Sequence, residues 1–411
     1  MKNKGNGITI HYAWVIACTG TLILLLSHGF GRMSYSVILP SMKDGLALTY
    51  TQVGLIGTAN FVGYLCLAVI GGFLATRFGI RRLVFISLLV MGVSLFLTGL
   101  SESFVSAFSA RLITGFGNGG SYIPAMALPA AWFAARKRGL ATGIQTIGTG
   151  IGLSITGLAL PYFIVMYGKE GWRYAWFLLG ALVFALSFVC YALLRDDPKE
   201  KGLTMYGGDE KRKNNSAVSF IAALKEVVGE KEIWKLGSIY FMYGFSYVIY
   251  FTFLIAYLTK EIGLTPKSAG HIFAVLGFFG IFSGVIWGSV SDVVGRRYGS
   301  MFAYITLAIS YLIIAFWKDS VGFYLSAIIF GLAFSAIPAI MTAAVGDQIG
   351  GRSAPAALGF ITLFFGTAQA LAPPLAGWIK DTTGTFTYAF IGAAIVSLIG
   401  GFGSLILKKK V

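Results

Sequence analysis

Residues 72–82, GFLATRFGIRR, and residues 288–298, GSVSDVVGRRY, are two copies of one short pattern that ends an apolar run with a glycine and a pair of arginines. A second pair of similar stretches follows at residues 113–125 and 329–339. Three pairs of glycines keep a single separation of 216 residues: Gly115 and Gly331, Gly143 and Gly359, and Gly150 and Gly366. A constant offset across three predicted helices indicates an internal duplication, so we expect two halves with one fold.

The composition is that of a membrane protein. The chain is 56% hydrophobic and 12% charged, with a mean hydropathy of +0.78, whereas soluble domains are about one quarter charged. A helix needs about 20 apolar residues to cross a bilayer. Twelve segments meet this length: 12–39, 50–75, 83–101, 104–131, 139–165, 174–194, 234–259, 268–290, 298–317, 321–346, 354–379 and 385–407. We therefore expect an all-α membrane protein with twelve transmembrane helices in two pseudo-symmetric six-helix bundles.

The distribution of lysine and arginine predicts the orientation of the chain. Loops on the side of the termini carry 23 of these residues and loops on the other side carry 7. Because cytoplasmic loops are rich in lysine and arginine, we expect a multi-pass protein of the cytoplasmic (inner) membrane with both termini cytoplasmic. The net charge of +16 is spread over many short loops, so it does not indicate binding to nucleic acid.

One long polar stretch divides the chain. It predicts an N-terminal bundle over residues 1–194, a cytoplasmic central loop over 195–233 and a C-terminal bundle over 234–411. The three cysteines lie in apolar segments without metal-binding or disulfide spacing, and we interpret them as small hydrophobic residues. We expect no metal, no cofactor and no enzymatic activity, and we expect a monomer in the lipid bilayer.

Along its whole length the chain resembles the major facilitator superfamily. The family pattern G-x-L-x-D-R-x-G-R-R is similar to Gly72, Leu74, Arg77, Gly79, Arg81 and Arg82, with Thr76 in place of the acid, and its second copy keeps Gly288, Asp292, Gly295, Arg296 and Arg297. RLITGFGNGG at residues 111–120 resembles the arginine-glycine motif of helix 4. The resemblance implies alternating access between two rocking bundles, with a weaker lock in the first half because the acid is missing.

APPLAGWIKD at residues 372–381 is similar to helix 11 of the monocarboxylate and oxalate–formate porters. That branch usually has an arginine in helix 8 or a lysine in helix 11. Here the predicted helix 8, HIFAVLGFFGIFSGVIWG, and the interior of helix 11 have neither residue. If the chain binds an anion, the positive charge must therefore come from the first half.

All 16 acidic residues fall in predicted loops or at helix ends, whereas Arg32, Arg111 and His28 lie inside predicted spans. Ionisable residues within a membrane cost at least a few kcal/mol and commonly mark function. A cavity for organic cations would need a buried carboxylate, so this bias favours an anionic substrate. The family resemblance implies that helices 1, 4, 7 and 10 line the cavity. The candidate substrate-binding residues are Arg32, His28 and Tyr35 on helix 1, Arg111, Asn118 and Tyr122 on helix 4, and Tyr243, Tyr247 and Tyr250 on helix 7.

Each candidate also has a structural interpretation. Arg32 can extend to the outer membrane interface, Arg111 can brace helix 1, His28 can hydrogen-bond a neighbouring backbone, and the tyrosine stripe can pack the bundle. The sequence predicts a secondary transporter of a small organic anion, resembling a monocarboxylate, by proton symport or by anion exchange. In symport the proton would be carried by His28. The alternatives are a proton-coupled exporter of amphipathic, drug-like compounds and a non-transporting membrane sensor.

Overall fold

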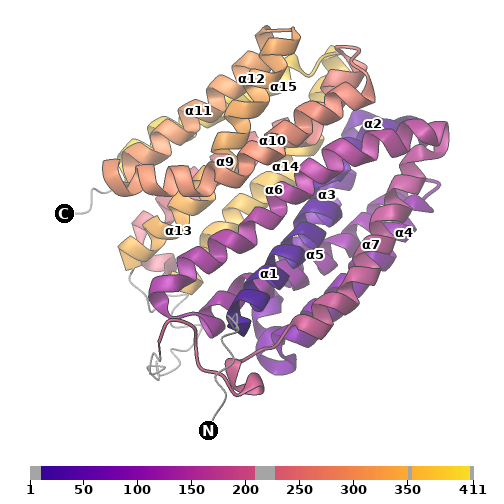
Figure 1. Cartoon of the computed structure of the whole chain (residues 1–411). Coiled ribbons are helices and arrows are strands. Elements are labelled where there is room, and N and C mark those ends of the chain that lie inside the picture. Colours follow the sequence, from indigo (N-terminus) through magenta and orange to yellow (C-terminus); the bar gives the residue numbers. More distant parts are fainter. Residues whose placement is uncertain (1–10, 209–226, 350–353, 408–411) are drawn as a thin grey trace.

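The computed structural model describes residues 11–208, 227–349 and 354–407, which are almost entirely helical. The first half contains α1 (Tyr12–Leu24), η1 (Leu25–Met33), α2 (Tyr35–Gly45), α3 (Tyr50–Phe78), α4 (Ile80–Gly99), α5 (Phe104–Trp132), α6 (Ala135–Met166) and α7 (Gly171–Leu193). The second half contains α9 (Lys231–Lys260), α10 (Pro266–Val294), α11 (Arg296–Phe316), α12 (Ser320–Ala333), α13 (Ala336–Ile349), α14 (Ala354–Thr383) and α15 (Thr387–Gly403). Figure 1 shows the two halves as long helical bundles that lie side by side.

Polar residues and glycines define where the helices begin and end. Thr49 caps the start of α3, where its hydroxyl accepts the N–H of Gln52 and the Gln52 side chain accepts the N–H of Thr49. Such a capping box satisfies backbone N–H groups that a helix leaves free. Gly79 and Gly295 join α3 to α4 and α10 to α11 with φ of +82° and +88°. Glycine adopts this left-handed region without strain. The two turns are again 216 residues apart, so the duplication extends to backbone conformation.

Eleven segments of the described chain are long and apolar enough to cross a membrane. The twelfth predicted span is α5, 29 residues long, whose glycines, Asn118 and Arg111 make it less apolar. The single predicted span over 321–346 is built from two helices, α12 and α13. At their junction the Ser335 N–H donates to Ser283 Oγ at 2.9 Å, which satisfies a backbone group that the interruption frees.

The two bundles meet along three pairs of helices. α6 lies against α10, α3 against α14, and α2 against α9. A Cβ atom added to Gly157 of α6 would lie 2.7 Å from the carbonyl oxygen of Gly270 on α10. One added to Gly54 of α3 would lie 2.4 Å from the carbonyl oxygen of Pro373 on α14. Small residues allow the backbones of these helices to approach this closely.

The contact between the bundles is concentrated at one end. We call the end with Gly79 and Gly295 the terminal end, because α1 begins and α15 finishes there, and the other the opposite end. At the opposite end Lys260 of α9 pairs with Asp44 of α2, and the Ser36 hydroxyl donates to the Phe251 carbonyl oxygen at 2.6 Å. Toward the terminal end, Cβ atoms added to glycines of α6, α10 and α14 would meet nothing within 4 Å: Gly139, Gly143, Gly288 and Gly359. The structure is therefore closed at the opposite end.

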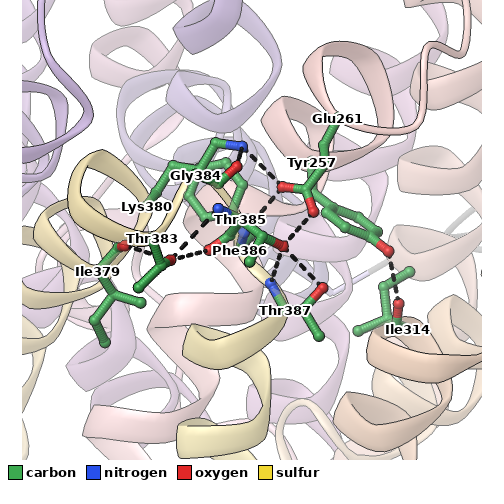
Figure 2. Close-up of polar contacts among 10 residues, drawn as sticks. All are labelled: Tyr257, Glu261, Ile314, Ile379, Lys380, Thr383, Gly384, Thr385, Phe386 and Thr387. Atoms are coloured by element: carbon green, nitrogen blue, oxygen red, sulfur yellow. Dashed lines mark hydrogen bonds and ion pairs between the residues drawn. The ribbon is translucent and has the colours of Figure 1, made fainter.

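Inside the second bundle, Glu261 organises the loops at the opposite end. Figure 2 shows its carboxylate accepting from the Lys380 ammonium at 2.9 Å, from the Phe386 N–H at 2.9 Å and from the Thr385 hydroxyl. Partial burial by itself raises the pKa of Glu261. These hydrogen bonds and the charge of Lys380 lower the pKa by more than burial raises it, so the pKa of Glu261 lies below the usual glutamate value. The ionised carboxylate therefore holds the end of α14 against the end of α9.

Candidate functional site

Arg32 stands on η1, a nine-residue π-helix between α1 and α2. π-helical segments are rare and are often found at functional sites. Two glycines allow η1 to pack closely against neighbouring helices. A Cβ atom added to Gly29 would lie 2.7 Å from Gly152 Cα of α6, and one added to Gly31 would lie 2.4 Å from Met91 Sδ of α4. The wide turn thus packs closely on two helices of the first bundle.

Arg32 is 6% exposed, and its guanidinium contacts neutral groups from both bundles. Its Nη1 lies 3.1 Å from His28 Nε2, and its Nη2 donates to the Tyr247 hydroxyl at 3.2 Å and to Gln369 Oε1. It also lies 4.3 Å from the centroid of the Phe61 ring. Its Nε has no partner in the described structure. Arg32 is therefore a buried cation without an ion-pair partner among the described residues.

Arg111 of α5 is 1% exposed and bonds the backbone of η1. Its Nη1 donates to the Gly31 carbonyl oxygen at 2.7 Å. The guanidinium lies 5.1 Å from the Tyr35 ring centroid and 5.0 Å from that of Trp176, and Arg111 Nε has no partner in the described chain. These contacts tie α5 to the segment that carries Arg32.

Arg32 and Arg111 line one small cavity of about 20 Å³, together with Tyr35, Asn60, Tyr247 and Thr252. A cavity of this size has room for about one water molecule. The structure is therefore nearly closed around the two arginines. The hydroxyl of Tyr35 is already used, because it donates to the Val53 carbonyl oxygen at 2.7 Å.

The three predicted tyrosines of α9 have different surroundings. Only the Tyr247 hydroxyl lies at Arg32, and it donates to Gln369 Oε1 at 2.7 Å. The Tyr250 hydroxyl lies 2.7 Å from Ser326 Oγ. The Tyr243 hydroxyl donates to the Phe334 carbonyl oxygen, four residues before Pro338. Because proline has no N–H to donate to that oxygen, Tyr243 replaces a missing helical hydrogen bond.

His28, Asn118 and Tyr122 lie together on the other side of Arg32. The centroid of the His28 ring lies 4.0 Å from that of Tyr122 and 6.1 Å from that of Tyr64 on α3. The Asn118 side-chain nitrogen donates to the Ser27 carbonyl oxygen at 2.5 Å. The polar side chains of helices 1 and 4 are thus brought together around η1.

Sequence reasoning missed Gln369, which is not among the predicted substrate-binding residues. It lies 337 residues from Arg32 in the chain, and its oxygen accepts from both Arg32 and Tyr247. A buried glutamine in an apolar span (1% exposed) is the signal that could have found it, because buried polar groups need partners.

The motif loops lie at the terminal end, away from Arg32. In the second half Arg296 pairs with Asp292 at 2.5 Å and with Asp347 at 3.1 Å. In the first half Arg81 donates from Nε to the Tyr191 carbonyl oxygen at 2.8 Å. Arg77 is exposed and lies over Phe78.

The first loop has an acid that the motif did not predict. Asp196, which follows α7, accepts the backbone N–H of Arg81 at 2.7 Å. A Cβ atom added to Gly79 would lie 2.4 Å from the Asp196 carboxylate. An acidic side chain therefore stabilises the start of α4, although it comes from a different part of the chain than the family pattern.

Comparisons with known proteins agree with this architecture. The chain is 27% identical to a probable sulfoacetate transporter of Cupriavidus necator, over 92% of this chain and 90% of that protein. It is 25% identical to a hexuronate transporter of Bacillus subtilis, covering 88% and 86%. It is 23% identical to monocarboxylate transporter 2 of Rattus norvegicus, covering 96% and 83%.

Among solved structures, a bacterial homologue of the human lysosomal transporter Spinster, inward-facing and occupied, has the same fold. Its TM-score is 0.78 at 14% identity, over 98% of each chain. The family profile described as Major Facilitator Superfamily matches residues 21–282 and 236–410. The predicted fold of twelve helices in two bundles is therefore confirmed, and the family and the relatives are transporters, not enzymes. The chain is a multi-pass membrane protein that belongs to the Major Facilitator Superfamily.

Proposed function

We propose that this chain moves a small organic anion across the cytoplasmic membrane by alternating access, with Arg32 as the group that binds the acid. The observation that carries the proposal is the buried Arg32 guanidinium, whose described partners are all neutral. Removing a charge from water is costly unless an opposite charge offsets it. An anionic substrate would supply that charge while it is bound.

The two bundles contribute different parts of this site. Arg32 comes from η1, where His28 contacts its guanidinium, whereas Tyr247 and Gln369 come from α9 and α14 of the second bundle. An anion between them would replace Gln369 Oε1 as the acceptor for Arg32 and accept from the Tyr247 hydroxyl. Binding would therefore change the contacts that join the bundles, as alternating access requires.

The names of the relatives favour the same substrate class, since they include transporters of sulfoacetate, hexuronate and monocarboxylates. An inside-negative potential opposes the uptake of a monoanion by about 2.3 kcal/mol per 100 mV. Uptake therefore needs a co-transported proton or exchange for another anion. Proton symport and anion exchange are both compatible with cytoplasmic termini, the orientation that the loop charges predict.

Uptake of labelled lactate, glucuronate and sulfoacetate into proteoliposomes tests the proposal. We expect the wild-type protein to transport at least one of them and Arg32→Gln to lower the rate roughly 30-fold or more, as expected for loss of a desolvated ion pair. Lys318→Gln is the matched control, because Lys318 is exposed at the opposite end and its variant should transport normally. Unchanged transport by Arg32→Gln would remove Arg32 from its role. Flux of hydrophobic cations, with none of the acids transported, would favour an exporter of amphipathic compounds.

A further inference from the structure

The contact between His28 and Arg32 favours one protonation state of the histidine. Arg32 Nη1 lies 3.1 Å from His28 Nε2. A guanidinium has only donors, so Nε2 must be the acceptor and carries no proton. The proton of the neutral imidazole then lies on Nδ1. A doubly protonated His28 would direct an N–H at the N–H of Arg32, so this contact favours a neutral ring.

The Nδ1 atom of His28 is buried and has no partner in the described structure. Two neighbouring groups share this property, the Ser27 hydroxyl and the Asn118 side-chain oxygen. Buried polar groups are nearly always paired, and exceptions in native proteins call for an explanation such as a functional role. The unpaired groups lie on η1 and α5, beside the proposed anion site.

No described acidic residue contacts His28 from the helices packed around it. On η1 it faces Arg32. From α3 and α5 it faces Tyr64, Tyr122 and Asn118. On α6, the residue that lies against η1 here is Gly152, beside Gly29. From the second bundle, Tyr247 and Gln369 hydrogen-bond Arg32, which in turn contacts His28. Arg32 is therefore the charged group in contact with His28, and its charge and its hydrogen bond both oppose a second proton on the ring.

Resting on the proposed function, we infer that His28 carries the proton of a symport reaction, and that an anion bound at Arg32 is what allows His28 to accept it. The anion takes the Nη1 and Nη2 donors of Arg32 and releases His28 Nε2 from its hydrogen bond. A proton from solvent then binds Nε2, and the imidazolium lies beside an anion as well as a cation. When the anion leaves, Arg32 again opposes the charged ring, and the proton leaves from Nε2.

This order of events has two consequences. One proton accompanies each anion, so transport of a monoanion moves no net charge. The empty carrier returns with a neutral His28, because the doubly protonated ring is compatible with Arg32 only while an anion is present. The other two histidines of the chain are placed differently: His11 caps the start of α1, and His271 lies near the start of α10.

Two measurements on reconstituted full-length protein separate proton coupling from anion binding, using whichever of lactate, glucuronate and sulfoacetate the wild type transports. The first is the accumulation of the anion at steady state under a pH gradient with the membrane potential held at zero, for which one coupled proton gives about tenfold accumulation per pH unit. The second is the rate of anion counterflow at equal pH on both sides. The test variant is His28→Gln, whose amide oxygen can accept from Arg32 but cannot take up a proton at physiological pH.

We expect His28→Gln to lose gradient-driven accumulation completely while counterflow falls by about threefold or less. Tyr64→Phe is the control, since it keeps the ring beside His28 and should retain accumulation. Accumulation by His28→Gln equal to the wild type would overturn the inference and leave the proposed function standing. Loss of counterflow to the same degree as accumulation, in a folded variant, would also overturn it, because His28 would then be an anion ligand.

If His28→Gln does not fold, His28→Asn is tested in the same two assays. A pH-sensitive dye inside the liposomes gives an independent measurement on the wild type. Anion uptake without proton movement would overturn the inference. Absence of transport of any of the acids by the wild type would instead contradict the proposed function.

Discussion

The carboxylate of Asp381, at the end of α14, accepts two hydrogen bonds from Thr51, in the first turn of α3. The Thr51 N–H donates at 2.8 Å and its hydroxyl at 2.7 Å. The N-terminus of a helix has free N–H groups and a partial positive charge, and it favours a carboxylate at this position. Asp381 belongs to the second bundle and Thr51 to the first, so this contact holds the opposite end closed.

Replacing Asp381 with asparagine should release the opposite end. A hydrogen bond to a charged group contributes about 1.5–3 kcal/mol, so the closed form should lose about tenfold to hundredfold in population. Val248 is 1% exposed beside the two arginines and reports the opening. In a background without the three native cysteines, Val248→Cys should react faster with a maleimide when Asp381→Asn is present.

Asp319→Asn is the matched control for Asp381→Asn. Asp319 also caps a helix at the opposite end, but its partners, Gly322 and Trp317, lie in the same bundle. It should leave the labelling rate of Val248→Cys unchanged. Equal acceleration by both variants would show that Asp381 stabilises its own bundle and does not close the site.

The pKa of Glu261, lowered by its hydrogen bonds, predicts an acid limit of stability. Its contribution is complete above the ordinary glutamate pKa of about 4.3 and is lost as the pH falls through the lower folded value. The melting temperature of the wild type should therefore decrease at pH values below about 4. Glu261→Gln should lower the melting temperature at neutral pH and make this decrease at acidic pH smaller. Glu102→Gln, an exposed acid at the same end, should keep the wild-type pH profile.

Asp196 should stabilise the first bundle, because it caps the start of α4. Replacing a helix-capping side chain with alanine costs about 0.5–2 kcal/mol, so Asp196→Ala should lower the melting temperature. Asp292→Ala removes the acid that fits the family pattern, but the Asp292 side chain is 66% exposed, and exposed ion pairs contribute little. A larger loss of stability for Asp292→Ala than for Asp196→Ala would contradict this ranking.

Gly157 and Gly143 lie on the same helix and predict opposite effects of one methyl group. A Cβ atom at Gly157 would come within 2.7 Å of the Gly270 carbonyl oxygen, whereas one at Gly143 meets nothing within 4 Å. Gly157→Ala should separate α6 from α10 and slow transport. Gly143→Ala should be neutral or should raise stability by about 0.5–1 kcal/mol, since alanine favours a helix. Both are measured as uptake rates and melting temperatures, and equal effects would exclude the α6–α10 contact as their cause.

A negative charge introduced at Gln369 tests the proposed anion site. Gln369→Glu should place a carboxylate on Arg32 and take the position of the substrate, so the variant should be thermally more stable than the wild type and lose stabilisation by added anion. Gln369→Leu removes an acceptor from Arg32 and should lower stability, because buried unpaired donors cost about 1–3 kcal/mol each. Anion-dependent melting shifts that Gln369→Glu retains would argue against binding at Arg32.

Features that depend on local sequence were predicted well. The lengths of the apolar runs predicted the helices, and the repeated glycine-arginine turns predicted the symmetry that Gly79 and Gly295 show in φ. The placement of the three predicted α9 tyrosines was less accessible. Their spacing predicts Tyr243, Tyr247 and Tyr250 on one face of the helix. In the structure the Tyr243 hydroxyl bonds the Phe334 carbonyl oxygen at the break before Pro338, and the Tyr250 hydroxyl bonds Ser326. Which hydroxyl stays near Arg32 depends on these neighbouring helices.

By itself the sequence determined that this is a twelve-helix membrane protein with a duplicated fold and a cation in its first span, because helix length, turn conformation and the cost of buried charge are local properties. Only the tertiary structure decided what surrounds that cation. Gln369 and Tyr247 lie 337 and 215 residues from Arg32, and a π-helical turn directs the arginine toward them. The packing of two bundles brings these groups together, and no pattern along one helix encodes it.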